Sequence, residues 1–280
     1  MREQRKKIAQ ETLKILQQGF YISPSGNHID ISDIQRRSES ACYFLTSEEG
    51  QRLINTLSVP DGSANVIYEV INTSTVKAII DTSKTDESVA ALNFASAKNP
   101  GGGFLNGAMA QEEALSYASG LYNTQLRQMA YYEANRACRS MMYTDYSIYS
   151  PDVVFFRDAA NRLLEEPVKA SILTLPAVNM GQVRVKGEDV SKAKQVMKNR
   201  MRLCLAILAH KRNKTILLGG WGCGVFCNDP NDVARWWKEL LEDEKYGGCF
   251  RRVLFVVLDK PGGKNIRAFE RVFGEGQRLF

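Results

Sequence analysis

The 280-residue chain is long enough for one large domain, or for one domain with an extension. Its hydrophobic content of 44% and charged content of 24% are ordinary for a globular protein, and no apolar run approaches the length of a membrane span. The net charge of +6 is compatible with a polyanionic ligand but does not require one. Because the N-terminus lacks the apolar core of a signal peptide, we expect an intracellular protein without membrane attachment.

The six cysteines and two histidines are scattered along the chain. An intracellular protein of this size does not need a disulfide framework. Cys223 and Cys227 are three residues apart, but His28 and His210 lie far from them in sequence. A zinc site usually shows two close pairs of ligands. We therefore expect neither a metal nor a cofactor.

The first part of the chain has no chemical constellation of its own. Residues 3–18 have the spacing of an amphipathic surface helix, residues 21–31 are extended around a turn, and a second helix is predicted over Ser32 to Leu45. We predict that residues 1–62 are a helical N-terminal extension docked on a larger domain over residues 63–280.

From Ala64 onward, apolar strands alternate with helical patterns. Strands are predicted over residues 66–71, 89–95, 153–156, 168–175, 215–219 and 253–258. Helices are predicted over residues 75–82, from 111 past 117, and over 121–141, 191–211, 231–242 and 264–273. Such alternation predicts an α/β fold with helices on both faces of the sheet.

The segment NPGGGFLNGAMAQEEALSYAS places three consecutive glycines seven residues before Gln111, Glu112 and Glu113. Glycines let the backbone approach a ligand closely and adopt positive φ angles. Two adjacent carboxylates at a helix start can act on such a ligand, or can simply interact favourably with the helix dipole. Since the two features follow a strand together, we favour a site that cleaves a bond in a phosphorylated or glycosidic ligand.

A second glycine-rich loop, GGWGCGVF, follows the strand predicted to end at Gly219. Asp229 and Pro230 then have the pattern of an N-cap and a first helical residue. Backbone N–H groups in such a loop form a concave site suited to a diphosphate. Neither loop contains Gly-Lys-Ser/Thr or GxGxxG, so the sequence supports neither ATP hydrolysis nor NAD-dependent redox chemistry.

Together, GGG followed by seven residues and QEE, the flanking LNFASAKNPGGG, and the distal WGCGVF with NDP resemble the bacterial-type (microbial and fungal) poly(ADP-ribose) glycohydrolases. The resemblance runs from about residue 64 to the C-terminus. It implies a three-layer α/β/α macrodomain with a mixed sheet and a helical N-terminal extension. It also implies ADP-ribose in the cleft, and a role in turnover of ADP-ribosylation and in the DNA damage response.

The resemblance assigns catalysis to Glu113, which would protonate the departing ribose oxygen and then, as a carboxylate, activate the attacking water. Glu112, the second expected catalytic residue, would hold a hydroxyl of the leaving ribose. Asn99 would bind hydroxyls of the ribose under attack, and Gln111 would position these contacts.

The resemblance places the diphosphate on the second loop and gives the substrate a second wall at the glycine triplet. The residues implied are Gly222, Cys223, Gly224 and Val225, with Gly102 and Gly103 of the substrate-binding triplet Gly101–Gly103 approaching from the other side. Phe226 would pack against the terminal ribose, although an aromatic beside glycines can also be core. Asn179 can reach the adenosine ribose or make a turn.

The partners expected from the resemblance are poly(ADP-ribose), ADP-ribose and ADP-ribosylated proteins, and the expected state is a monomer. We expect exo-type hydrolysis of ribose–ribose O-glycosidic bonds that releases ADP-ribose. Three alternatives are a hydrolase of single ADP-ribosyl groups, a macrodomain that only binds ADP-ribose, and an unrelated nucleotide-binding scaffold. The two carboxylates argue against a pure binder of a polyanion.

Overall fold

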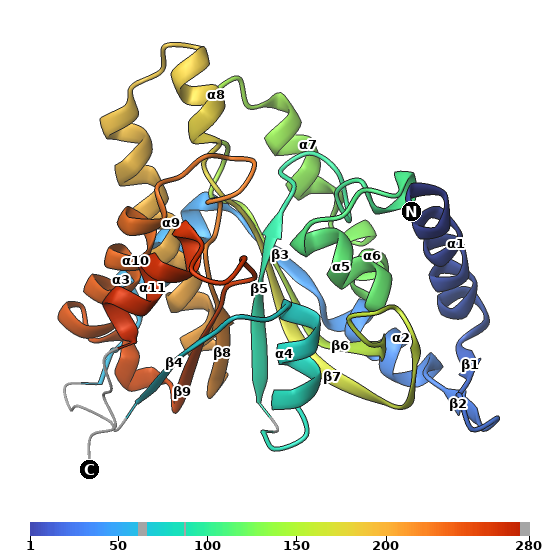
Figure 1. Cartoon of the computed structure of the whole chain (residues 1–280). Coiled ribbons are helices and arrows are strands. Elements are labelled where there is room, and N and C mark those ends of the chain that lie inside the picture. The colour runs from blue at the N-terminus through green and yellow to red at the C-terminus, as the bar shows by residue number, and fades with distance from the viewer. Residues whose placement is uncertain (61–65, 87, 275–280) are drawn as a thin grey trace.

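The computed structural model of the chain describes residues 1–60, 66–86 and 88–274. Within these residues, seven strands form one mixed sheet that lies between helices (Figure 1). In sheet order, the strands are β3 (Tyr43–Leu45), β6 (Ser147–Arg157), β7 (Leu163–Pro176), β5 (Val89–Ala95), β8 (Thr215–Leu218), β9 (Arg252–Val256) and β4 (Ile67–Ile71). This arrangement confirms the predicted α/β architecture with a mixed sheet.

The strands that approach the site are parallel. Strand β5 pairs in parallel with β7 on one side and β8 on the other, and β8, β9 and β4 continue the parallel arrangement. Only β6 and β3 run antiparallel to their neighbours in the described sheet. The carboxyl ends of the parallel strands therefore share one edge, where their loops meet and where open α/β sheets bind ligands.

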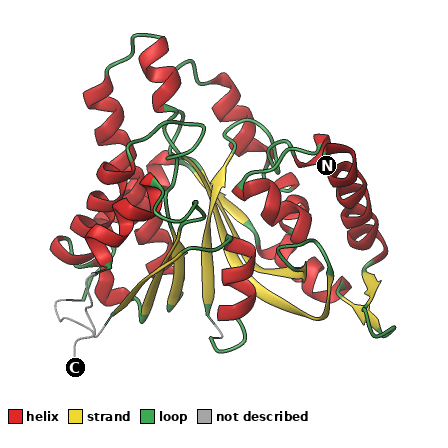
Figure 2. Ribbon diagram, in the orientation of Figure 1, coloured by secondary structure: helices red, strands yellow, loops and turns green. Residues whose placement is uncertain are grey.

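Side chains along each central strand alternate between two hydrophobic clusters, as the period of a pleated strand requires. In β5, Ala90 and Leu92 belong to one cluster, whereas Val89 and Ala91 belong to the other. The first cluster includes side chains of α9 (Val190–His210), α10 (Pro230–Lys238) and α11 (Lys264–Phe273). The second includes side chains of α4 (Thr75–Thr82), α5 (Gln111–Ala118) and α6 (Leu121–Leu126), so helices cover both faces (Figure 2).

The N-terminal segment is mainly helical, but it also supplies the edge strand β3 of the sheet, which the sequence did not predict. It contains α1 (Arg2–Gln18), a small hairpin of β1 (Phe20–Ile22) and β2 (His28–Asp30), α2 (Ser32–Ala41) and α3 (Ser47–Thr56). The expected boundary between residues 62 and 63 falls outside the described residues. No helix of the described residues is long and apolar enough to cross a bilayer.

The prediction that the second helix extends to Leu45 is wrong. Helix α2 ends at Ala41, because Cys42 takes an extended conformation with φ −71° and ψ 142°. The next three residues form the edge strand β3, which pairs with the first residues of β6. Ring contact between Tyr43 and Tyr149 accompanies this pairing, and aromatic residues pack well on a sheet. Sheet pairing therefore overrides the local helical pattern.

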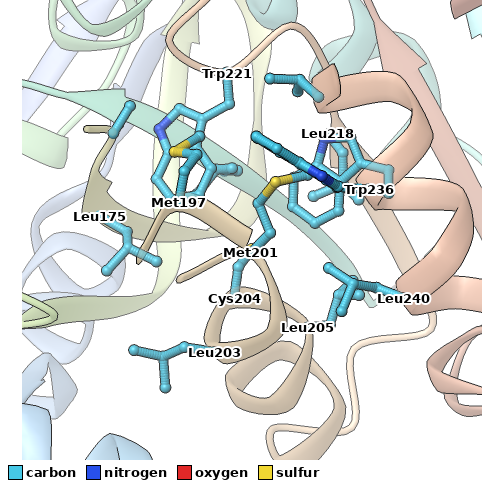
Figure 3. Close-up of a cluster of buried hydrophobic side chains, with 14 of the residues drawn as sticks. Leu175, Met197, Met201, Leu203, Cys204, Leu205, Leu218, Trp221, Trp236 and Leu240 are labelled. Atoms are coloured by element: carbon cyan, nitrogen blue, oxygen red, sulfur yellow. The ribbon is translucent and has the colours of Figure 1, made fainter. Parts of the chain in front are cut away.

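The loop that follows β8 is anchored in the larger hydrophobic cluster. Figure 3 shows Trp221 from this loop among Met197 and Met201 of α9 and side chains of β8 and α10. Trp221 is fully buried and stacks on Trp237 at a ring-centroid distance of 6.5 Å. The indole nitrogen of Trp237 also donates to the carbonyl of Gly219. The core thus fixes the position of the loop's first residues.

Candidate active site

A cavity of about 520 Å³ opens at the carboxyl ends of the parallel strands. Its lining comes from the ends of β5 and β9, from the start of α5, and from the loops after β4 and β8. Residues of the predicted site in this lining are Gln111, Glu112, Glu113, Gly222, Gly224, Val225 and Phe226. The start of α5 and the second glycine-rich loop, more than 100 residues apart in sequence, therefore line one cavity.

Gln111 joins the start of α5 to β5. Its side-chain oxygen accepts a hydrogen bond from the backbone N–H of Phe94 at 2.9 Å. Its side-chain nitrogen donates to the carbonyl of Leu92 at 2.8 Å and lies 3.3 Å from the hydroxyl of Thr75 in α4. The side-chain amide thus bonds to β5 as the backbone of a neighbouring strand would, and it fixes the first turn of α5 against the sheet. The role expected for Gln111 in positioning substrate contacts stays a prediction.

Glu112 is almost completely buried and is held by three donors. Its Oε1 accepts from the side-chain amides of Asn93 and Gln125 at 3.1 and 3.0 Å, and its Oε2 accepts from the backbone N–H of Ser96 at 2.6 Å. Burial raises the pKa of this carboxyl to about 7, although the three hydrogen bonds act in the opposite direction. Glu112 is therefore a rigid, weakly acidic carboxyl at the inner wall of the cavity.

Glu113 lies beside it and is less constrained. Its Oε1 accepts a hydrogen bond from the backbone N–H of Gly103 at 2.9 Å, and 9% of the residue is exposed. Both glutamates belong to the first turn of α5, where the helix dipole favours negative charge. The structure thus places two carboxyls of different freedom side by side in the cavity lining.

The glycine triplet is packed against these carboxyls. Gly102 has φ +59°, and a Cβ on it would lie 2.4 Å from Oε1 of Glu113 and 3.1 Å from Oε2 of Glu112. Gly101 has φ +62°, and its N–H donates to the side-chain oxygen of Gln125 at 2.8 Å. Gly102 is therefore required by the carboxyls themselves, a contact that the sequence did not predict, whereas a Cβ on Gly101 would meet Phe104 and one on Gly103 would meet Ala108. The three glycines are absent from the cavity lining, so their expected contact with the diphosphate stays a prediction.

The second loop has a glycine that the fold requires and one that it does not. Gly222 has φ +74°, and a Cβ there would lie 2.5 Å from Nδ2 of Asn228 and 2.8 Å from Cβ of Ala177. At Gly224, no atom of the described residues other than the glycine and its two chain neighbours lies within 4 Å of the position of a Cβ. Its lack of a side chain therefore leaves open space in front of the loop, as a ligand that contacts the backbone would need.

Val225 and Phe226 form the outer part of the second loop. Val225 is 87% exposed, and the half-buried ring of Phe226 packs against the larger core cluster and lies 6.2 Å from the ring of Tyr143. An exposed valine next to a cavity gains apolar contact only when a ligand covers it. Phe226 therefore belongs both to the core and to the cavity lining.

Three other residues considered in the sequence are not in the cavity lining. Asn99 is exposed, and its backbone N–H donates to the hydroxyl of Ser96. Cys223 is buried, and burial raises the pKa of its thiol to about 12, which agrees with a structural role. Asn179 accepts from the backbone N–H of Gln182 as the N-cap of α8 (Met180–Val185), so the turn role of Asn179 is confirmed.

The residues that hold Glu112 were not predicted from the sequence. Asn93 and Gln125 are fully buried, and both nitrogens lie within 3.5 Å of the hydroxyl of Thr174 in β7. Gln125 also bonds Gly101, so one α6 side chain connects the glycine triplet to Glu112. A polar Asn93 within the apolar run VAALNFA was the one available signal. Within the described residues, no group of three or more His, Cys, Asp and Glu side chains is placed to hold a metal ion.

Comparison with known proteins gives the family. Residues 9–158 match the model of the microbial-type PARG catalytic domain, where PARG stands for poly(ADP-ribose) glycohydrolase. The chain belongs to the microbial-type PARG family. The matched residues include the glycine triplet, Gln111 and both glutamates but end before the second loop. Comparison with curated proteins found no match.

Solved structures of PARGs cover the rest of the fold. The PARG from Thermomonospora curvata is 38% identical with a TM-score of 0.92, and the match covers 97% of this chain and 100% of that one. The same enzyme bound to the inhibitor ADP-HPD matches with a TM-score of 0.89, 38% identity, and coverage of 96% and 99%. The Deinococcus radiodurans PARG in complex with ADP-ribose is 42% identical, with a TM-score of 0.81 and coverage of 85% and 96%. These similarities confirm the macrodomain fold and the family implied by the two sequence motifs.

Proposed function

We propose that this protein hydrolyses the ribose–ribose O-glycosidic bonds of poly(ADP-ribose) and releases ADP-ribose from chain ends. The observation that carries the proposal is one cavity whose lining includes both Glu112 and Glu113 and the open backbone at Gly224. The solved relatives bound to ADP-ribose and to ADP-HPD support this assignment.

Glu113 acts as the general acid and base in this proposal. Cleavage of a glycosidic bond passes through an oxocarbenium-like centre and requires a proton for the leaving oxygen and a base for water. Glu113 keeps one oxygen without a hydrogen-bond partner within the described chain, whereas Glu112 has donors on both oxygens. The freer carboxyl is the one able to exchange a proton with substrate and then with water.

Glu112 has the complementary role of fixing geometry. Its three donors hold the carboxyl close to Gly102, so it can orient a hydroxyl of the leaving ribose that enters between the two glutamates. Because its pKa is raised to about 7 by burial, a substantial protonated fraction can itself donate a hydrogen bond near neutral pH.

Other parts of the cavity lining have features suited to an adenosine. They include Thr73 and Ser74 after β4, Leu258 after β9, and Asn265 in α11. Leu258 is 72% exposed, and Oδ1 of Asn265 is a buried acceptor without a partner among the described atoms. An adenosine offers an apolar ring to the leucine and hydroxyl or amine donors to the asparagine.

The variant Glu113→Gln tests the proposed function. It removes the proton donor and preserves shape, so we expect turnover of labelled poly(ADP-ribose) to fall by about 10⁴-fold, near the upper end for a general acid–base group. Calorimetry should show that the variant still binds ADP-ribose. Hydrolysis near the wild-type rate would exclude Glu113 from the mechanism.

Product analysis tests the direction of attack. If the adenosine end admits only a terminal unit, free ADP-ribose dominates from the earliest time points and long polymers shorten from their ends. Early release of oligomers from within the chain would contradict exo-type cleavage. We further propose that the last ADP-ribose on a modified protein persists, because that bond offers Glu112 no ribose leaving group to orient.

A further inference from the structure

The first turn of α1 is attached to the loop that connects the glycine triplet to the catalytic helix α5. The guanidinium Nε of Arg2 donates to the carbonyl of Asn106 at 2.9 Å, and that of Arg5 donates to the carbonyl of Gly107 at 2.8 Å. Gly107 has φ +75°, and a Cβ on it would lie 2.5 Å from the carbonyl oxygen of Arg2. The helix and the loop therefore touch backbone to backbone at a position that only glycine allows.

A second layer of contacts attaches α1 to α5 itself. The hydroxyl of Thr12 donates to the carbonyl of Tyr117 at 2.8 Å, and both side chains are fully buried. Ala9 packs with Phe104 and Tyr117 in a small hydrophobic cluster that is separate from the two main clusters. Figure 1 shows α1 lying on the outer side of α5 and α6.

Hydrogen bonds within the loop connect these contacts of α1 to Glu113. The hydroxyl of Tyr117 lies 2.9 Å from the carbonyl of Phe104 and 2.8 Å from that of Ala108, so it connects both ends of the segment that α1 holds. Ala108 donates its N–H to the carbonyl of Gly103, and Gly103 donates its own N–H to Oε1 of Glu113. A displacement of the loop at Gly107 would therefore alter the hydrogen bond on the catalytic carboxyl.

We propose that Arg5, assisted by Arg2, is a positioning residue for catalysis, and that α1 serves to hold the 104–108 loop at the geometry that Glu113 needs. This inference rests on the proposed function of Glu113. The second glycine-rich loop is anchored separately, through Trp221 in the larger core cluster. Loss of Arg5 should consequently reduce the rate of bond cleavage and leave binding of the diphosphate unchanged.

The experiment compares Arg5→Ala, Arg5→Lys and Lys7→Ala with wild type on poly(ADP-ribose). Because a misplacement of about 1 Å can cost about 100-fold in rate, we expect Arg5→Ala to lower kcat by roughly 10- to 100-fold. The Kd for ADP-ribose, measured by calorimetry, should stay within about twofold of wild type, since the diphosphate loop is untouched. Arg5→Lys retains a donor for Gly107 and should recover most of the rate.

Lys7→Ala is the matched control, because it removes one positive charge from an exposed position of the same helix. It should leave kcat unchanged. An equal loss of kcat in Lys7→Ala would show that α1 only attracts the polyanion and would overturn the positioning role. A wild-type kcat in Arg5→Ala, or a fall in ADP-ribose affinity as large as the fall in kcat, would also overturn it.

Hydrogen exchange separates failure of this inference from failure of the proposed function. If the wild-type protein does not cleave the polymer, the proposed function fails. Backbone amides of residues 103–108 should still exchange faster in Arg5→Ala than in Lys7→Ala, because the docking does not depend on the reaction. Equal exchange in the two variants would show that Arg5 does not hold the loop.

Discussion

The raised pKa of the buried Glu112 carboxyl predicts how the free energy of unfolding changes with pH. Burial raises its pKa from the ordinary 4.5 to about 7. Between these two values the native protein retains a proton that the unfolded chain has lost. The contribution of Glu112 to stability is therefore complete below pH 4.5 and is lost as the pH rises through 7.

The size of this loss follows from the shift. At about 1.4 kcal/mol per pKa unit, the contribution falls by roughly 3 kcal/mol between pH 4.5 and pH 8. Glutamine at this position does not titrate. Its amide would meet the donors of Asn93, Gln125 and Ser96, which costs stability by an amount that does not vary with pH. The change with pH in the difference between the unfolding free energies of wild type and Glu112→Gln therefore reports the ionisation of Glu112 alone.

Urea denaturation of wild type and Glu112→Gln at pH 4.5, 6, 7 and 8 measures this change. We expect the free energy of unfolding of the variant to rise relative to wild type by about 3 kcal/mol across the range. The exposed Glu133 of α7 (Met129–Ala137) provides the control Glu133→Gln, which removes a carboxylate that faces solvent. A difference between wild type and Glu112→Gln that stays constant with pH would refute the raised pKa.

Glycine substitutions separate the parts of the site. Gly102→Ala should lower kcat by about 100-fold, because its Cβ would displace the carboxylate of Glu113; a wild-type kcat in steady-state assays would show that the carboxylate adapts. Gly224→Val should weaken ADP-ribose binding at least about tenfold in calorimetry, since open space lies in front of Gly224. Its thermal unfolding midpoint should remain close to wild type, and unchanged affinity would place the diphosphate elsewhere. Gly222→Ala should instead lower the unfolding midpoint, because its Cβ would collide with Asn228; an unchanged midpoint would contradict this contact.

The sequence by itself determined the elements whose evidence is local. The apolar run Val89–Ala95 forms β5, and α5 begins at Gln111 with the two glutamates in its first turn. Both could be predicted because the strand end, the glycine turn and the helix start are neighbours in sequence. The closing helix Lys264–Phe273 has the bounds that its pattern predicts. The same local features carry the family resemblance, which the comparisons confirm.

Only the tertiary structure decided which residues surround the carboxyls. Gln125 lies 13 residues from Glu112 on another helix, and Arg5 lies 102 residues from Gly107. Neither contact can be predicted from the sequence, because a single polar residue on a helix gives the same pattern whether it faces solvent or a buried partner. The short strand Tyr43–Leu45 likewise exists through its pairing with β6. Hydrophobic periodicity records which face of an element is buried, whereas the partner on that face is fixed only when the chain folds.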